Sequence, residues 1–379
     1  MDRGLPPELK NINERYVAAF LNFPVYMGCT SQPSEEDVFR DMFWVANGSR
    51  APLEVEPVLP NELIYQANHN EPVGGLWKNH HKAFGEFVAK HAIGSYVYEI
   101  GGAHGLASIS AKLRRDLSWT IHDLNPIPDE NYFGEIIEGN FGSKTTKIPP
   151  KFKTVVHSHT IEHVHSSIEF LQAISMNQNI GDVQIFSYPN MDLMLSRGNL
   201  NFLNFEHTAF LPLRFVKEII AQIGYKIVEV YKYLDHSIFI SCVKVDKVMD
   251  YTEIDSKLLT EEEALFESYF LSIESKVSNL NEALLSSEHK SKFIFGAHVF
   301  TQMLIAFGLE TDSLSGCLDN SKSKIGKRLY GTNLEVFDPT QVLALSESMV
   351  VMSVADYAEE IKSQINEITD GRCKIVDAG

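Results

Sequence analysis

From residue 95 onward, short apolar runs alternate with stretches in which apolar residues recur at helical spacing. The runs predict buried strands, and strands that alternate with helices indicate a doubly wound parallel sheet. The predicted strands are residues 96–100, 119–123, 154–158 and 182–188, and the predicted helices are residues 107–117, 167–176 and 212–223. Residues 226–233 and 237–245 are two further strands, which we expect to pair antiparallel near a sheet edge.

A shorter alternation follows a long helix-forming stretch. Residues 255–285 are acidic and helix-prone, and we expect them to connect two domains. After them we predict a strand at 292–297 that enters a glycine turn, a helix near 299–307, and strands at 315–318 and 349–354. This pattern predicts a smaller α/β unit at the C-terminus.

The first 75 residues lack a clear period, and we expect an irregular N-terminal region there. They are rich in proline and asparagine, and prolines make residues 52–60 extended rather than helical. A helix over residues 75–90 then leads into the main domain. The predicted units are an N-terminal region (1–75), the main α/β domain (76–250), a helical connector (251–285) and a C-terminal Rossmann-like domain (286–379).

Composition indicates a folded protein with more than one domain. The chain has 379 residues, of which 44% are hydrophobic and 22% charged. A net charge of −17 argues against broad nucleic-acid binding, because phosphate contacts need a positive surface. No apolar run approaches the roughly 20 residues that cross a bilayer, and the N-terminus lacks a signal-peptide pattern. Four widely spaced cysteines suit free thiols, so we expect a cytoplasmic protein without membrane or nucleic-acid partners.

The first candidate for chemistry is the loop after the strand 96–100. Gly101, Gly102, Ala103 and Gly105 directly precede a predicted helix, so a ligand can approach the backbone and its free amides. Sites for dinucleotides and for S-adenosyl-L-methionine (SAM) share this pattern, and so do plain strand-to-helix turns. Glu99 adds weight, because a carboxylate in an apolar strand is costly without a cationic or hydrogen-bonding partner. The amino group of a methionine-like ligand would be such a partner, whereas an exposed Glu99 would need none.

Further positions on the same α/β unit suit a nucleoside. Asp123 ends the second strand, 18 residues beyond Gly105, where a carboxylate can accept hydrogen bonds from ribose hydroxyls. We assign its neighbour Leu124 to the same site. Asn140 and Phe141 offer a polar group and a ring that could border an adenine. Each has an ordinary alternative, with Asp123 as a turn cap and Phe141 in the core, but their order favours a cofactor site.

The sequence Glu-x-Gly-Gly-Ala-x-Gly, the acidic end of the second strand and the segment Ser158–Val164 together resemble class I SAM-dependent methyltransferases. In that family a His-x-x-Glu-His-type segment follows the fourth strand and lies beside the methyl donor. The resemblance therefore implies SAM as the cofactor and places His159 next to it. A nicotinamide dinucleotide is the rival ligand, but the chain has no Tyr-x-x-x-Lys set for proton relay.

A narrower resemblance rests on residues 204–210 and on a series of motifs near the C-terminus. The series is Phe295–Ala297, Asp319–Ser321, Lys324, Gly326, Gly331–Thr332 and Pro339. Together they are similar to the deoxysugar C-methyltransferases, which join an N-terminal domain, a SAM domain and a C-terminal Rossmann-like domain. The resemblance runs from about Phe20 to Val354 and is strongest between Ser95 and Phe210.

This resemblance implies C-methylation of a nucleotide-linked keto sugar. A proton leaves the carbon beside the ketone, and the enolate attacks the methyl group of SAM. His207 would be the general base, because imidazole titrates near neutrality, and Glu206 would orient or polarise it. A structural Glu-His pair in a loop is the alternative.

The N-terminal region departs from that family in its cysteines. Related enzymes have a zinc-binding, cysteine-rich region, whereas only Cys29 precedes Cys242 here, and the nearby histidines do not replace four ligands. We therefore predict neither zinc nor another metal. The resemblance still implies substrate roles for Tyr65, His80 and His163, although His159 and His163 could also be packing groups.

Two other functions remain open. The altered N-terminal region would fit an O- or N-methyltransferase of a small metabolite or a glycan precursor. A non-catalytic scaffold that keeps the fold is the second alternative. The leading hypothesis expects a small-molecule acceptor, namely a nucleotide sugar.

Overall fold

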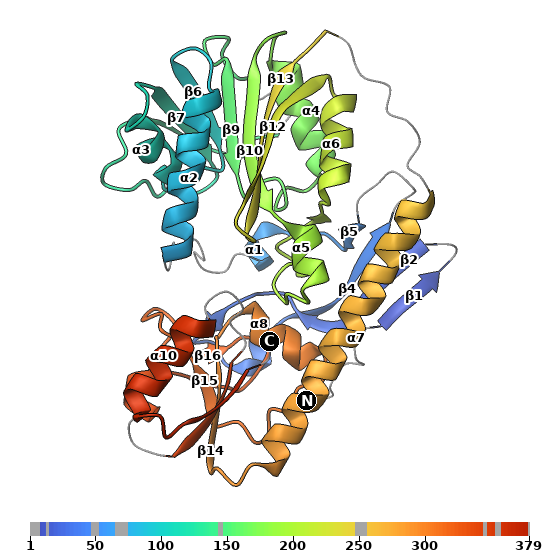
Figure 1. The fold of residues 1–379 in the computed structure, drawn as a ribbon, viewed down its shortest axis with the longest axis vertical. Coiled ribbons are helices and arrows are strands. Elements are labelled where there is room, and N and C mark those ends of the chain that lie inside the picture. The colour runs from blue at the N-terminus through green and yellow to red at the C-terminus, as the bar shows by residue number, and fades with distance from the viewer. Residues whose placement is uncertain are drawn as a thin grey trace.

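Three larger sheets and one two-stranded sheet organise the chain in this computed structural model (Figure 1). The structure describes residues 8–12, 15–46, 53–64, 75–142, 147–246, 256–343, 347–352 and 358–377. In Figure 1 the seven-stranded sheet lies at the top, the C-terminal sheet lies at the bottom, and the N-terminal strands lie between them.

The largest sheet has seven strands in the order β12-β13-β10-β9-β6-β7-β8. The five strands from β10 to β8 are parallel, and β13 is antiparallel to both of its neighbours. The bounds are β6 Tyr96–Ile100, β7 Ser118–Asp123, β8 Glu135–Glu138, β9 Thr154–Ser158, β10 Val183–Pro189, β12 Tyr225–Tyr233 and β13 Ser237–Lys244. This arrangement confirms the doubly wound α/β fold and its antiparallel edge pair. β8 escaped prediction because all of its residues are exposed, so it shows no buried run.

Helices cover both faces of this sheet. α2 (Gly75–His91) and α3 (Leu106–Lys112) pack on one face, and α4 (Ser167–Asn177) and α6 (Leu213–Gln222) pack on the other (Figure 1). Val97 and Val156 pack in the core on the side of α2 and α3. Their neighbours Tyr98 and Val155 pack in the core on the side of α4 and α6. Successive strand residues point to opposite faces, which explains why these strands are apolar throughout.

The expectation of an irregular N-terminal region is wrong. β1 (Glu8–Ile12), β2 (Arg15–Pro24), β4 (Phe39–Ala46) and β5 (Leu53–Glu56) form an antiparallel sheet, which β11 (Ala209–Phe210) extends. Met42 and Trp44 are buried at a spacing of two, as in a half-covered strand. In β2 a register shift between Phe20 and Phe23 interrupts the period of two. Such a bulge makes the alternation of apolar and polar residues irregular, so the sequence pattern does not predict the strand.

The C-terminal residues form the predicted second α/β unit. Its five parallel strands lie in the order β17-β15-β14-β18-β19. They are β14 Ser291–Phe295, β15 Gly316–Leu318, β17 Val336–Phe337, β18 Ser348–Met352 and β19 Lys374–Asp377, and the helices are α8 Val299–Ala306, α9 Pro339–Val342 and α10 Ala358–Thr369. The remaining short helices of the described chain are η1 Ser34–Glu36, α1 Asn61–Ile64 and α5 Met191–Ser196.

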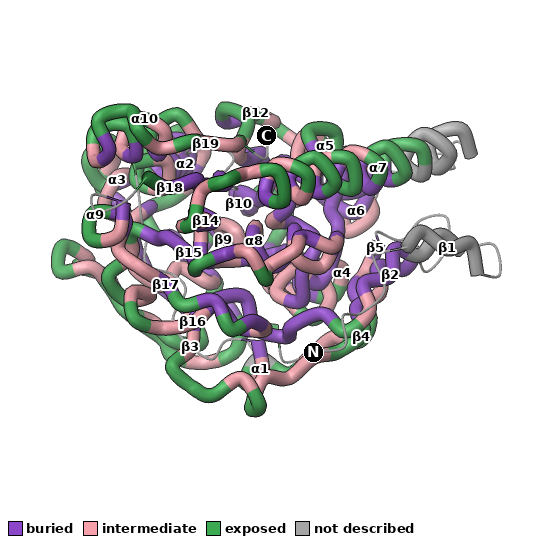
Figure 2. Tube along the Cα trace, turned by 90° about the horizontal axis from the view of Figure 1, so that it is seen from below, coloured by how far each residue is buried: buried purple, intermediate pink, exposed green. Residues whose placement is uncertain are grey.

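One long helix, α7 (Ser256–Ser286), connects the two α/β units (Figure 1). Its 31 residues span about 46 Å at 1.5 Å per residue. Phe266, Phe270, Ile273 and Val277 are buried at helical spacing, while the opposite side is exposed along most of its described length (Figure 2). None of the helices in the described ranges has both the length and the apolar character that a membrane span needs.

A buried segment, Val25–Cys29, joins the N-terminal sheet to the C-terminal unit. β3 (Cys29–Thr30) pairs with β16 (Arg328–Leu329), and the Tyr330 amide donates to the Gly28 carbonyl oxygen at 2.9 Å. Close by, the Arg328 guanidinium binds both carboxylate oxygens of Asp37, at 2.6 and 2.7 Å. Asp37 is almost fully buried, so this bidentate pair lies largely out of water.

We predict that Asp37→Ala will lower the free energy of unfolding by about 3–5 kcal/mol, because it leaves a mostly buried guanidinium without its counter-charge. Denaturant titration of the full chain measures the loss. Glu359→Gln removes an exposed partner of Lys362 and is the control, with an expected loss under about 1 kcal/mol. Equal losses in the two variants would contradict a special role for the Asp37 pair.

Candidate active site

A cavity of about 450 Å³ lies at the carboxyl ends of β6 and β9 and is walled by several parts of the chain. Its described lining includes Met27 from the N-terminal region, Trp77 and His81 from α2, and His298–Phe300 from the C-terminal unit. Of the residues that the sequence singles out, the cavity is lined by Glu99, Gly101, Gly102, Ala103, His159, His163, Glu206 and His207. A second cavity of about 410 Å³, between α3 and β8, is lined by none of them. The clustering of chemical groups makes the first cavity the candidate site.

The glycine loop passes tightly against the residues around it. Gly101 has a φ of 72°, and a Cβ there would lie 2.5 Å from Thr160 Oγ1. A Cβ on Gly102 would lie 2.6 Å from the Cδ of Glu99. Gly105, also at positive φ, precedes α3. Glycine is therefore required at Gly102 to leave room for the carboxylate, and at Gly101 for the turn.

Glu99 is buried, and its partner in the structure is Trp119. The indole Nε1 of Trp119 donates to Glu99 Oε2 at 2.7 Å. Burial raises the pKa of Glu99 to about 7, although the indole hydrogen bond opposes the rise. The predicted need for a partner is thus met in part by a neutral donor, and a positive charge beside Glu99 would favour its ionised form.

Asp123 braces the glycine loop. Its Oδ2 accepts from the Ala103 amide at 3.0 Å, and its Oδ1 accepts from the Asn125 amide at 2.8 Å. Each carboxylate oxygen has a second lone pair, so a ribose contact stays a prediction. Leu124 and Asn140 are exposed, whereas Phe141 is buried against Tyr98, His122 and Phe170. Their places beside an adenine also stay predictions.

The loop after β9 carries a buried carboxylate between two histidines. Glu162 is fully buried, and its Oε1 lies 3.1 Å from His159 Nδ1 and 4.0 Å from His163 Nε2. Burial raises the pKa of Glu162 to about 7, and His163 opposes the rise. Burial also holds the pKa of His159 well below its usual range. We did not select Glu162 from the sequence, although it is the acidic member of the quoted His-x-x-Glu-His segment.

Backbone carbonyls orient the two histidines on the other side of the cavity. His207 Nδ1 lies 2.8 Å from the Phe202 carbonyl oxygen, and His163 Nδ1 lies 2.8 Å from the Glu206 carbonyl oxygen. A carbonyl only accepts, so each Nδ1 carries the proton and each Nε2 is the basic nitrogen. The partner of His207 Nδ1 is therefore a backbone oxygen, and the orienting role of the Glu206 side chain stays a prediction.

Burial sets the charge states of Glu206 and His207. It raises the pKa of Glu206 to about 8 and lowers the pKa of His207 to about 3. At neutral pH the carboxyl group therefore keeps its proton and the imidazole is neutral. A neutral imidazole can accept a proton, but a pKa of about 3 makes His207 a weaker base than the imidazole titrating near neutrality that the sequence led us to expect.

Of the remaining predicted substrate residues, the structure describes His80, which is not part of the cavity lining. His80 is fully buried in α2, where its ring contacts Trp77 and His159. Tyr65 lies outside the described residues. Sequence reasoning also missed His236, which lines the cavity from the turn between β12 and β13. The only available signal was its place between two strands predicted to pair.

One comparison with known proteins agrees with the predicted class of enzyme. A family model described as "C-methyltransferase C-terminal domain" matches residues 236–378. The C-terminal part of the chain is similar to that domain. The match confirms the predicted class of enzyme, a methyltransferase, and does not identify the acceptor that is methylated. None of the curated proteins matches the chain.

Solved structures of methyltransferases are similar to part of the chain. An O-methyltransferase family protein from Burkholderia thailandensis is 15% identical over 45% of this chain and 57% of its own, with a TM-score of 0.37. An O-methyltransferase from neocarzinostatin biosynthesis, in complex with SAM and a naphthoic acid, is 16% identical over 45% and 56%, also at 0.37. An S-adenosylmethionine-dependent methyltransferase from Mesorhizobium loti is 10% identical over 42% and 98%, at 0.34. Likenesses at this level say nothing about the reaction of this chain.

We predict that Glu99→Gln will stabilise the ligand-free protein relative to the natural chain, and more so as the pH rises from about 4.5 to about 7. A carboxyl group whose pKa is raised on folding binds more protons folded than unfolded in that window, so its contribution to stability falls with pH. The glutamine can still accept from Trp119. Denaturant midpoints at several pH values measure the difference, which should reach the order of 3 kcal/mol.

The buried histidines have lowered pKa values, so their contribution to the free energy of unfolding changes with pH in the opposite direction. They are present in both chains, so the difference in this free energy between the variant and the natural chain reports Glu99 alone. Glu86→Gln is the control, because its hydrogen bond from Arg114 lowers the pKa of Glu86 and reverses the sign. A pH-independent difference for Glu99→Gln would show that its carboxyl group is not perturbed.

Proposed function

We propose that this protein is a SAM-dependent methyltransferase that C-methylates a nucleotide-linked keto sugar. The observation that carries the cofactor assignment is the set of ionisable side chains in the cavity wall, which has carboxyl groups but no lysine or arginine among the described residues. Its described lining contains Glu99, Glu162, Glu206 and Asp235 but neither lysine nor arginine. SAM, with a sulfonium and an ammonium group, suits such a lining, whereas a dinucleotide would bring an uncompensated pyrophosphate into it.

The residues of the glycine loop fit SAM by shape and by donor chemistry. Gly101 and Gly102 leave a surface that side chains would fill, and the buried carboxylate of Glu99 lines the cavity beside it. Glu99 would hold the ammonium group, and Asp123 would hold the ribose. When bound, SAM supplies an activated methyl group, so the protein's part is alignment and proton handling. Four free cysteines are in keeping with the cytoplasmic location that we include in this proposal.

His207 is the general base of the proposal. Its Nε2 faces away from the bond that fixes Nδ1, and the residue lines the cavity. The C–H bond next to the ketone would break, its proton would pass to Nε2, and its electron pair would form the enolate. The enolate carbon would then take the methyl group as the sulfur–methyl bond breaks, and the neutral thioether would leave. Because Glu206 keeps its proton at neutral pH, it adds no negative charge beside the enolate.

Two hydrogen bonds hold the Glu206–His207 loop in place. The Thr208 amide donates to the Glu162 carbonyl oxygen at 2.7 Å, and the Val55 amide donates to the Thr208 carbonyl oxygen at 2.9 Å. The loop is thereby fixed to the segment after β9 and to the N-terminal sheet. Such support is what a base needs if it is to meet a carbon-bound proton at short range.

The lack of a cation in the described lining also favours a second candidate. A nucleotide sugar would have to keep its diphosphate outside the cavity, whereas an uncharged metabolite would not. O- or N-methylation of such a metabolite would use the same SAM site. NMR of the product separates the two, because only C-methylation forms a carbon-bound methyl group.

We predict that Gly102→Ala will weaken SAM binding at least tenfold, because its Cβ would displace the Glu99 carboxylate. Isothermal titration calorimetry with SAM measures the change. Gly75→Ala is the matched control, since a Cβ there meets no atom of the described residues within 4 Å. Equal affinity of both variants for SAM would show that the glycine loop is not part of the cofactor site. If the natural chain does not bind SAM, a non-catalytic scaffold is favoured.

We predict that His207→Ala will bind SAM as the natural chain does but will lose methyl transfer at least 100-fold, in line with the usual effect of a general base. Transfer of a labelled methyl group to a panel of nucleotide-linked keto sugars is the measurement. His289→Ala is the control, because His289 precedes β14 whereas the lining residues His298–Phe300 follow that strand. Undiminished transfer by His207→Ala would exclude His207 as the base.

A further inference from the structure

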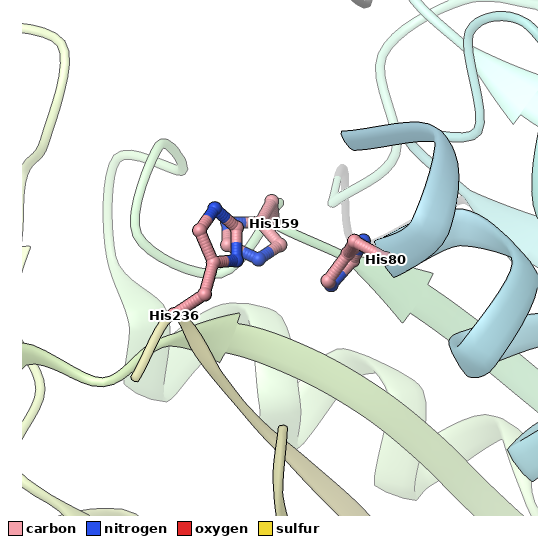
Figure 3. A group of neighbouring side chains, drawn as sticks. All are labelled: His80, His159 and His236. Atoms are coloured by element: carbon pink, nitrogen blue, oxygen red, sulfur yellow. The ribbon is translucent and has the colours of Figure 1, made fainter. Parts of the chain in front are cut away.

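Three histidines from distant parts of the chain meet beside the cavity (Figure 3). His80 comes from α2, His159 from the loop after β9, and His236 from the turn between β12 and β13. One nitrogen of each ring lies within 4.8 Å of one nitrogen of each of the others. We propose that these three imidazoles bind one zinc ion, as a site that goes beyond the proposed methyl transfer.

The spacing of the rings fits a tetrahedral centre. The ring centroids are 4.9 Å apart for His80 and His159, 5.4 Å for His80 and His236, and 5.5 Å for His159 and His236. A Zn–N distance of about 2 Å puts each centroid roughly 3 Å from the ion, and the centroids therefore about 5 Å from one another. The three rings are thus already at the right separation, and turning them about their side-chain bonds would bring the nitrogens to the ion.

His80 is the residue that a metal explains best. It is 0% exposed, and neither of its ring nitrogens has a hydrogen-bond partner among the residues that the structure describes. Leaving a buried polar atom unpaired costs about 1–3 kcal/mol, so two in one ring require a reason. Its stacking on Phe84 and its edge contact with Phe239 would be served equally by a phenylalanine. A metal–nitrogen bond would use one of the two ring nitrogens, which these packing contacts leave without a partner among the described residues.

The other two histidines have the supporting partners of metal ligands. His159 Nδ1 lies 3.1 Å from the buried Glu162 carboxylate, an arrangement that directs Nε2 away from it and increases its basicity. His236 Nδ1 lies 2.6 Å from Ser237 Oγ, which also lies 2.8 Å from His159 Nε2. Zinc would replace the second of these hydrogen bonds. A cation there would also compensate the charge of ionised Glu162.

The fourth position of the ion would face the cavity. His159 and His236 line the cavity, whereas His80 lies behind them. Three protein ligands and one open position are typical of zinc sites that hold a water molecule or a substrate oxygen. This site uses no cysteine, so it differs from the cysteine site whose absence the sequence suggested, and it revises the expectation that the chain binds no metal.

A neighbouring group, Glu162, His163 and His207, also has three ligand atoms within 4.8 Å of one another. A metal there would occupy the nitrogen that the proposed base needs. A test of the zinc site must therefore show which of the two groups of ligands binds the ion, and substitutions at His80, His236 and His207 distinguish them.

The full-length protein, stripped of metal with a chelator, is titrated with Zn²⁺ in competition with a chromophoric chelator. Co²⁺ is then added in place of Zn²⁺, and the visible spectrum reports whether it is four-coordinate. We expect one equivalent of Zn²⁺ and four-coordinate Co²⁺ bands. His80→Phe and His236→Gln should each weaken Zn²⁺ binding at least 100-fold.

His80→Phe keeps the ring and removes both unpaired nitrogens, so the metal-free variant should melt no lower than the natural chain. His236→Gln provides a second test at a less buried position. His91→Gln, on the same helix but paired with Glu229, and His207→Gln should bind Zn²⁺ as the natural chain does. The proposal fails if no Zn²⁺ binds, if His80→Phe binds it unchanged, or if His207→Gln alone abolishes binding.

Discussion

The burial of Val25–Cys29 is the constraint on which the arrangement of the site depends. A buried loop must find a partner for each of its backbone polar groups, and this one finds them in two units at once. The Val25 amide donates to Val38 within the N-terminal region, while the Tyr26 carbonyl oxygen accepts from Gln302 of α8. Met27 lies between Tyr26 and Gly28, whose carbonyl oxygen accepts from the Tyr330 amide, and it lines the cavity. The fit of the C-terminal unit against the cavity is thus set by hydrogen-bond satisfaction as well as by apolar contact.

Three glutamic acids line one cavity, and Glu99 and Glu162 are buried, which is a cost that the free protein carries. Glu99, Glu162 and Glu206 all have pKa values raised by burial, which means that the fold disfavours their ionised forms. A cationic ligand would reverse that preference by compensating the charge. The same side chains therefore lower the stability of the empty protein and favour a positively charged ligand, a balance often found at functional sites.

The sequence predicted most of the central domain, because its strands are buried on both faces and read as apolar runs. It predicted Glu99 as a residue that needs a partner, but not Trp119, since that contact depends on how β6 and β7 align. The N-terminal sheet was missed because a bulge interrupts its period. The Phe202 carbonyl oxygen that orients His207 belongs to the backbone and has no sequence signal at all. Likewise, the meeting of His80, His159 and His236 follows only from the packing of α2 on the hairpin.

The turn between β12 and β13 shows how little freedom some loops of this protein have. Tyr233 pairs with Ser237, so the turn consists of Leu234, Asp235 and His236, with Leu234 at a φ of 48°. The His236 carbonyl oxygen also accepts from the Asn190 amide at 3.0 Å. One inserted residue would swing the imidazole away from the cavity and break this bond to the end of β10. Hairpin length is therefore a diagnostic trait: relatives that use the histidine should keep a three-residue turn.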